Sequence, residues 1–124
     1  MDQFDLPKGY INNFTEIFDV GNNFNPKTGS FRINNEDLFS NGNYIFNVNA
    51  MQFRLAYGDI SVWKNQERVK IIDRFYTGIM NNVFTLHLQK GDKVKLKNEK
   101  YSVYSKIIVT SDYPLTFTGY GPFY

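Results

Sequence analysis

The chain of 124 residues is long enough for one domain with a sizeable core, and its 42% apolar residues exclude an intrinsically disordered protein. The absence of cysteine excludes disulfide bonds and thiolate metal sites, and a net charge of +2 does not by itself favour a polyanion as the partner. No apolar run approaches the length of a membrane span, and the acidic, proline-broken residues 1–10 do not resemble a signal peptide. Aromatic residues make up 18% of the chain, an enrichment that is typical of β-strands.

Strand patterns separated by turn signals occupy the first part of the chain. Residues 10–20 are rich in aromatic and β-branched side chains and predict a strand. Residues 24–33, with the sequence FNPKTGSFRI, predict a strand end, a turn and a new strand, because Pro26 fixes its own φ and Gly29 tolerates a positive φ. The Asn-Gly pair at 41–42 is a further signal for a tight turn.

The next two segments predict longer strands. Residues 44–55 alternate, with Tyr44, Phe46 and Val48 on one face and more polar side chains on the other, which is typical of a strand with one buried face. Residues 59–75 contain two strand patterns around a central polar turn, so they predict a hairpin.

The last part of the chain continues in the same way. Residues 81–98 predict a second hairpin that turns at Gly91 and Asp92, and residues 101–111 and 113–124 predict two further strands. No segment shows a helical period in its apolar residues. Eight to ten short strands with frequent turns therefore indicate a single all-β domain, either a sandwich or a barrel.

Five motifs in a fixed order resemble the globular head of complement C1q, a family that is structurally related to tumour necrosis factor. The motifs are residues 24–31 (FNPKTGSF), 42–46 (GNYIF), 62–69 (VWKNQERV), 86–96 (LHLQKGDKVKL) and 117–119 (FTG). The resemblance runs from about residue 17 to residue 124 and covers most of the chain, so the whole of residues 1–124 is expected to be one C1q-like domain.

The resemblance implies a ten-strand jelly-roll sandwich of two antiparallel sheets that assembles as a homotrimer. The inner sheet of such a fold would contain residues 44–53, 83–89 and 115–124, which carry no charged side chain. Buried contacts between subunits favour aromatic residues and disfavour charge. We therefore expect seven residues to lie either in the core or in the trimer interface, without distinguishing the two: Tyr44, Phe46, Phe84, Leu86, His87, Phe117 and Tyr124.

Residues suited to catalysis or to metal binding are scarce. His87 is the single histidine and cannot form a zinc site or activate a serine without partners, so no catalytic or metal role is assigned. The resemblance leaves calcium near the trimer axis open, with no ligands assigned, because related domains sometimes bind it through acidic loops. Asp59 and Asp92 are interpreted as ordinary solvated acids at turns or strand ends.

A basic segment remains as the one candidate for a ligand surface. Strand alternation puts Lys93, Lys95 and Lys97 on one face, where they could contact a sulfated glycan or another anion. The simpler interpretation is a solvated outer strand whose lysines prevent edge pairing. Nucleic acid is not favoured, because nucleic-acid modules interleave exposed aromatics with such charge, and only Tyr101 and Tyr104 lie nearby in the sequence.

These observations predict a non-catalytic trimeric recognition head that binds a protein or glycan through its loops. Two alternatives stay open: a structural trimerisation cap on a fibrous or stalked protein, such as a spore coat, a phage fibre or a collagen-like stalk, and a secreted ligand that clusters a receptor. An extracellular or particle-surface location is expected, as part of a longer protein. The sequence identifies neither the ligand nor any stalk.

Overall fold

The structure is a computed structural model that describes residues 3–6, 8–12, 23–33, 41–52, 58–75, 78–99, 107–110, 113 and 115–123. All regular elements within these ranges are strands. In chain order they are β1 (Gln3–Asp5), β2 (Gly9–Tyr10), β3 (Phe24–Asn25), β4 (Ser30–Arg32), β5 (Gly42–Gln52), β6 (Gly58–Lys64), β7 (Glu67–Phe75), β8 (Gly78–Leu88), β9 (Lys93–Glu99), β10 (Ile108–Thr110) and β11 (Thr116–Phe123).

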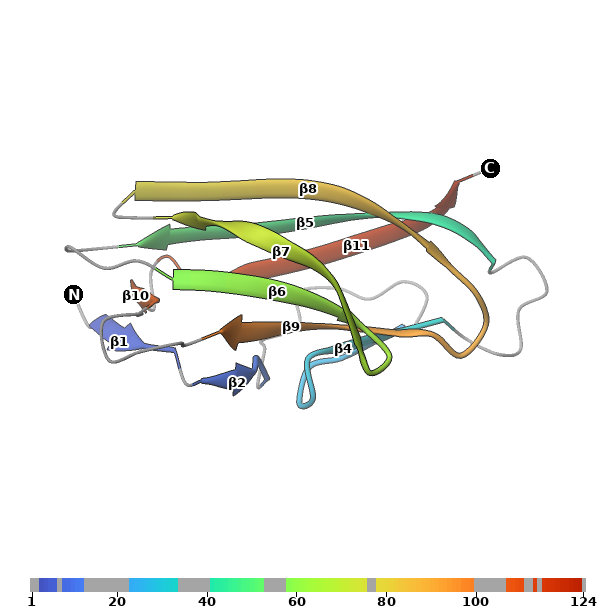
Figure 1. Ribbon diagram of the computed structural model, residues 1–124, viewed down its shortest axis with the longest axis horizontal. Helices are drawn as coiled ribbons and strands as arrows, with labels where there is room; N and C mark the ends of the chain where they lie inside the picture. Colours follow the sequence, from blue (N-terminus) through green and yellow to red (C-terminus); the bar gives the residue numbers. More distant parts are fainter. Residues whose placement is uncertain are drawn as a thin grey trace.

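Two main antiparallel sheets form the sandwich. The three-stranded sheet has the order β11-β5-β8, and the six-stranded sheet has the order β3-β4-β9-β6-β7, with β2 paired to β9. Figure 1 shows β8, β5 and β11 along one side of the molecule and β9 and β4 along the other, and the short β1–β10 pair lies at one end. The predicted jelly-roll sandwich of two antiparallel sheets is therefore confirmed, with eleven strands in the described ranges where the resemblance implied ten.

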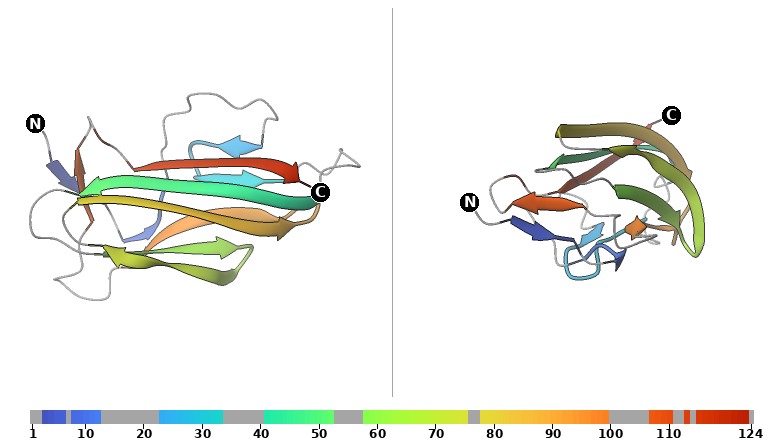
Figure 2. Two further views of the ribbon diagram at one scale, coloured as in Figure 1. Left: turned by 90° about the horizontal axis from the view of Figure 1, so that it is seen from above. Right: turned by 60° about the vertical axis from the view of Figure 1, so that its left-hand side comes forward.

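The prediction that three separate segments pair in one sheet is also confirmed for their described residues. The three segments, residues 44–53, 83–89 and 115–124, correspond to β5, β8 and β11, which lie side by side in Figure 2. The pairing of β5 with β8 is continuous from Gly42 opposite Leu88 to Gln52 opposite Gly78. This long, regular ladder gives the three-stranded sheet a continuous outer face, whose residues are described below.

The turn in residues 24–33 forms as the sequence predicts. Gly29 has a φ of 72°, which a residue with a Cβ adopts less readily. The Asn25 side chain closes the turn because its Oδ1 accepts hydrogen bonds from the Lys27 N–H at 3.0 Å and from the Thr28 N–H at 3.4 Å. The strands on either side then pair Phe24 with Phe31, which brings their rings to the same face.

Aromatic rings fill the space between the two sheets. Phe46 is fully buried at the centre, and its ring stacks on Phe84 at 5.6 Å and on Phe117 at 5.7 Å between centroids. Phe31, from the opposite sheet, meets the Phe46 ring edge-on at 5.2 Å. Phe31, one of the aromatic residues beside the turn in residues 24–33, thus packs against the other sheet and helps to connect the two sheets.

Two turns at one end of the sandwich are tied together by Asp92. The Gln89 N–H donates to Asp92 Oδ2 at 2.9 Å, and Asn65 Nδ2 donates to Asp92 Oδ1 at 3.1 Å. Lys64 Nζ lies 3.7 Å from Asp92 Oδ2. Burial raises the pKa of Asp92, but these hydrogen bonds and the Lys64 charge outweigh that effect and hold its pKa below the usual value. Asp92 is thus a structural acid and not the solvated acid that the sequence suggested.

Replacing Asp92 with asparagine is expected to lower the free energy of unfolding at pH 7 by about 1–3 kcal/mol, because a charge-assisted acceptor is lost. A carboxyl group whose pKa is depressed by folding stabilises the protein above its unfolded pKa of about 3.9 and loses that effect as the pH falls through the folded value. Denaturant unfolding of both proteins should therefore show a difference that is full at pH 7 and shrinks below about pH 4.

Glu67 is an exposed carboxylate beside the neighbouring β6–β7 turn, so its replacement is a control for the loss of a negative charge at this end of the sandwich. Glu67→Gln should change the stability by less than about 0.5 kcal/mol at either pH. A constant difference between wild type and Asp92→Asn from pH 7 to pH 3 would contradict the assigned role of the carboxylate charge.

Candidate binding and assembly surfaces

The outer face of the three-stranded sheet carries no charged side chain among the described residues. In β5 the residues Tyr44, Phe46, Val48 and Ala50 are buried, so their neighbours point to the opposite face. Strand register extends this face across β8 and β11. We call it the open face, and its residues are Asn43, Ile45, Asn47, Asn49, Met51, Ile79, Asn81, Val83, Thr85, His87, Thr116, Thr118 and Tyr120.

Three apolar side chains on the open face are strongly exposed. Ile79 is 76% exposed, Val83 is 60% exposed and Tyr120 is 53% exposed. All three lie on β8 and β11, the strands on either side of β5 in this sheet. An uncharged face with exposed Ile, Val and Tyr has the composition of a surface that contacts another protein.

The residues expected in the core or the interface occupy different positions. Tyr44, Phe46 and Phe84 are buried inside the sandwich, and Leu86 and Phe117 are partly buried against that core. His87 lies instead on the open face, where its Nδ1 is 3.3 Å from Asn43 Oδ1.

Tyr124 falls outside the described residues. A direct role of any of the seven residues in subunit contacts stays a prediction.

No group of three or more His, Asp or Glu residues in the described ranges is arranged to hold a metal ion. Asp59 is only 8% exposed, so its interpretation as a solvated acid is wrong. Within the same ranges, no helix is long and apolar enough to cross a membrane.

The lysines of β9 lie on the outer face of the six-stranded sheet. Val94 and Leu96 are fully buried between them, so Lys93, Lys95 and Lys97 point outward, as predicted. However, β9 is bonded to β4 on one side and to β6 on the other. The interpretation that these lysines protect a sheet edge is therefore wrong, because β9 lies inside the sheet.

Two aromatic residues that sequence analysis did not select lie beside these lysines. Tyr10 and Trp63 meet edge-on with 6.0 Å between their ring centroids. Lys97 Nζ lies 4.8 Å from the Trp63 ring and 5.6 Å from the Tyr10 ring, and Lys95 Nζ lies 5.0 Å from the Tyr10 ring. The ammonium groups are thus held over the rings by cation–π contacts.

A buried hydrogen-bond chain fixes Trp63 in this position. Trp63 Nε1 donates to Ser61 Oγ at 2.9 Å, and Ser61 Oγ donates to Glu99 Oε1 at 2.7 Å. Arg68 Nη1 lies 3.8 Å from the same carboxylate oxygen and compensates its charge. Strand alternation in the sequence is enough to predict that Trp63 lies on the outer face. Its contact with Tyr10 could not be predicted in that way, because it depends on the pairing of strands that are far apart in the chain.

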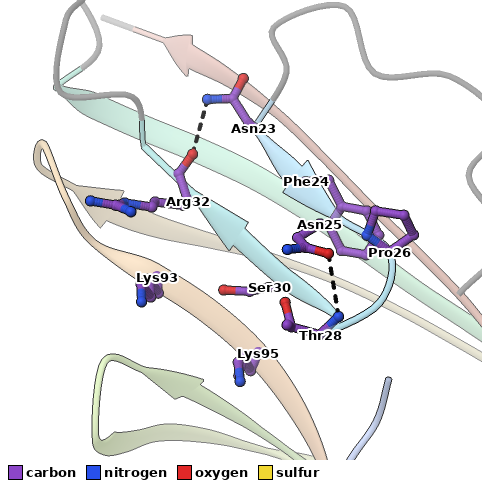
Figure 3. Close-up of a pocket in the computed structure, with 9 residues that line it drawn as sticks. All are labelled: Asn23, Phe24, Asn25, Pro26, Thr28, Ser30, Arg32, Lys93 and Lys95. Atoms are coloured by element: carbon purple, nitrogen blue, oxygen red, sulfur yellow. Dashed lines mark hydrogen bonds between the residues drawn. The ribbon is translucent and has the colours of Figure 1, made fainter. Parts of the chain in front are cut away.

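A pocket of about 540 Å³ adjoins the lysines at the β3–β4 turn (Figure 3). Arg32 and Lys93 are directly paired across β4 and β9. Ser30 is 8% exposed, and its Oγ has no hydrogen-bond partner. The complete lining is Asn23, Phe24, Asn25, Pro26, Thr28, Ser30, Arg32, Lys93 and Lys95.

Comparison with known proteins identifies the family of the chain. No curated protein matches the sequence significantly. A model of the C1q domain family matches residues 7–120, which is most of the chain and includes nearly all of the strands described above. With the jelly-roll sandwich in place, this match shows that the chain belongs to the C1q domain family.

Proposed function

We propose that the protein is a non-catalytic recognition head that assembles as a homotrimer and binds a protein or glycan partner outside the cell or on a particle surface. Membership of the C1q domain family supports a recognition module of this kind. In this proposal residues 1–124 form a single domain, and the three copies in a trimer strengthen individually weak contacts with a multivalent partner.

The open face is the observation that carries the proposal. Charged residues are depleted in the buried parts of protein interfaces, while aromatic residues and Met are enriched there. The open face has no charge and exposes Ile79, Val83 and Tyr120, whereas the outer face of the six-stranded sheet carries Lys93 and Arg32. Apolar side chains are exposed on both outer surfaces, Ile71 of the six-stranded sheet included, but only the open face lacks charge, as expected if other subunits cover it.

The mass of the particle in solution tests the assembly. Sedimentation equilibrium or light scattering at micromolar concentration should give three times the chain mass of 14.5 kDa. A mass that stays at one chain over a tenfold range of concentration would contradict the trimer. A trimer that binds partners saturably at one site per subunit is a recognition head, whereas a purely structural cap would show no saturable binding.

A further inference from the structure

We propose that the pocket at the β3–β4 turn binds a sulfate or phosphate ester group carried on a carbohydrate chain. This inference rests on the proposed recognition function and gives it a ligand class and a site on each subunit. The site is separate from the open face, because the pocket lies on the outer surface of the six-stranded sheet. It therefore stays accessible in a trimer that is built through β5, β8 and β11.

The chemistry of the lining is that of an anion site. Three cationic side chains, Arg32, Lys93 and Lys95, border the pocket, and no carboxylate is among its lining residues. Because Phe31 and Val94 are buried opposite each other, the next pair along the register, Arg32 and Lys93, points outward. If the same antiparallel register continues past Phe31 and Val94 on their other side, Ser30 lies beside Lys95.

Ser30 supplies the observation that points to a ligand. A buried hydroxyl without a partner is costly, and native proteins avoid it in most cases. Ser30 is more than nine-tenths buried and its Oγ has no partner, although it lines the pocket among the cationic residues. Figure 3 shows its hydroxyl directed into the space between Arg32, Lys93 and Lys95. A bound oxyanion would accept a hydrogen bond from it.

In the described part of the chain, the pocket cations have no carboxylate partner, in contrast with Lys64 and Arg68 of the same sheet. Lys64 lies near Asp92 and Arg68 near Glu99, at 3.7 Å and 3.8 Å respectively. Among the described residues, no carboxylate lies within ion-pair distance of Arg32, Lys93 or Lys95. Cationic side chains that border one pocket without a carboxylate attract an anion to it, and a guanidinium is well suited to a tetrahedral oxyanion.

The rest of the lining favours a carbohydrate over a nucleic acid as the carrier. Asn25 and Thr28 offer amide and hydroxyl groups, which suit sugar hydroxyls. Single-stranded nucleic acids are bound by stacking bases on open aromatic faces. The neighbouring rings of Tyr10 and Trp63 are instead covered by Lys95 and Lys97 of the same chain.

Binding of a heparin-derived hexasaccharide tests the site, measured by calorimetry alongside its fully desulfated form. Arg32→Gln combined with Lys93→Gln should raise the dissociation constant by about tenfold or more, because two charge-assisted contacts are lost. Lys8→Gln combined with Lys90→Gln is the matched control, since it removes the same charge from exposed lysines that do not line the pocket. The control should change the dissociation constant by less than about twofold.

Ser30→Ala separates a binding role from a structural one. In the free protein this substitution removes a buried hydroxyl that has no partner, so the thermal unfolding temperature should stay the same or rise. Binding of the hexasaccharide should nevertheless weaken about three- to tenfold, without a change in its salt dependence, because no charge is lost. A lower unfolding temperature for Ser30→Ala would overturn the proposal, because it would mean that the hydroxyl serves the fold.

Competition identifies the ester group and the carrier. Inorganic sulfate or inorganic phosphate should displace the hexasaccharide more strongly than sodium chloride of equal ionic strength. If sulfate displaces it better, the preferred ligand group is a sulfate ester, and if phosphate does, it is a phosphate ester. Equal binding of the desulfated sugar would overturn the proposal, and so would tighter binding of a single-stranded oligonucleotide or of phosphatidylserine vesicles.

The particle mass, measured on the same samples, separates this inference from the proposed assembly. A trimer that does not bind the hexasaccharide overturns the binding site alone. A monomer that binds the hexasaccharide overturns the trimer and supports the site.

Discussion

Phe46→Ala is expected to lower the free energy of unfolding by about 3–5 kcal/mol, the usual cost of truncating a fully buried ring. Phe46 is 0% exposed, and its ring contacts Phe31 from the opposite sheet as well as Phe84 and Phe117 from neighbouring strands. The surrounding rings cannot all close on the space, because Phe84 and Phe117 are held on strands that are hydrogen-bonded to β5, and Phe31 is held in the opposite sheet. The cavity term therefore adds to the lost transfer free energy.

Gly119 shows how closely this ring is enclosed. A Cβ placed on Gly119 would lie 2.6 Å from Phe46 Cε1, which is closer than atoms of this kind approach one another. Gly119 pairs with Phe46 across β11 and β5, so the glycine leaves the room that the ring occupies. The sequence motif that ends in Gly119 is thus explained by the packing of Phe46 and not by a turn.

Denaturant unfolding at a fixed protein concentration measures the Phe46 effect, since subunit association contributes to apparent stability. Ile71→Ala is the control, because Ile71 is 46% exposed on the outer face of the six-stranded sheet, and it should cost less than about 1 kcal/mol. Similar losses for the two variants would mean that the ring cluster is not the centre of the core.

Local patterns predict the strands and turns well in residues 24–33, 44–52, 59–75 and 81–98, whereas most of the predicted strands 10–20 and 101–111 falls outside the described residues. The alternation of Tyr44, Phe46 and Val48 correctly identifies the buried face of β5, because a strand that covers a core repeats every two residues. Gly29 has the positive φ that the turn requires, and Gly91, in the predicted Gly-Asp turn, has a φ of 84°. The same period of two residues correctly places the lysines of β9 on one face of their strand.

Contacts between distant segments are beyond the reach of these patterns. Tyr101 and Tyr104 are the aromatic residues that follow the lysines in the sequence, and both fall outside the described residues. The rings that do contact the lysines are Tyr10 and Trp63, which β2 and β6 bring to either side of β9. The pairing of strands far apart in a chain depends on the whole sheet and leaves no local signal.

The pocket at the β3–β4 turn cannot be predicted from the sequence either, because it depends on the pairing of strands that are far apart in the chain. Ser30 and Arg32 have the pattern of ordinary residues in a strand that follows a turn, and only Lys93 and Lys95 stand out by their charge. The pairing of β4 with β9 brings the two sets together. The sequence also cannot separate core from interface among its apolar residues, since Phe46 and Ile45 differ only in which face of β5 they occupy.

Val83→Asp is expected to convert the trimer into monomers at micromolar concentration while leaving the fold intact. Val83 is 60% exposed and pairs with Asn47 in the middle of the open face, so an aspartate there is hydrated in a monomer and costs little. In a trimer in which the open faces of the three subunits meet, each subunit would bury one carboxylate that lacks a cationic partner, since the open face has no Lys or Arg. An unpaired buried charge costs several kcal/mol, and the trimer would contain three of them.

Val69→Asp is a closely matched control for this prediction. Val69 is also an exposed valine within a strand, but it lies on β7 of the six-stranded sheet and not on the open face. Sedimentation equilibrium should show one chain mass for Val83→Asp and three for Val69→Asp, with the same β-rich circular dichroism spectrum for both. Trimers of both variants would mean that assembly uses another surface, and monomers of both would mean that the aspartate acts through the stability of the subunit. Dissociation of Val83→Asp alone assigns the interface to the open face, because both substitutions add the same charge at an exposed strand position and only Val83 lies on that face.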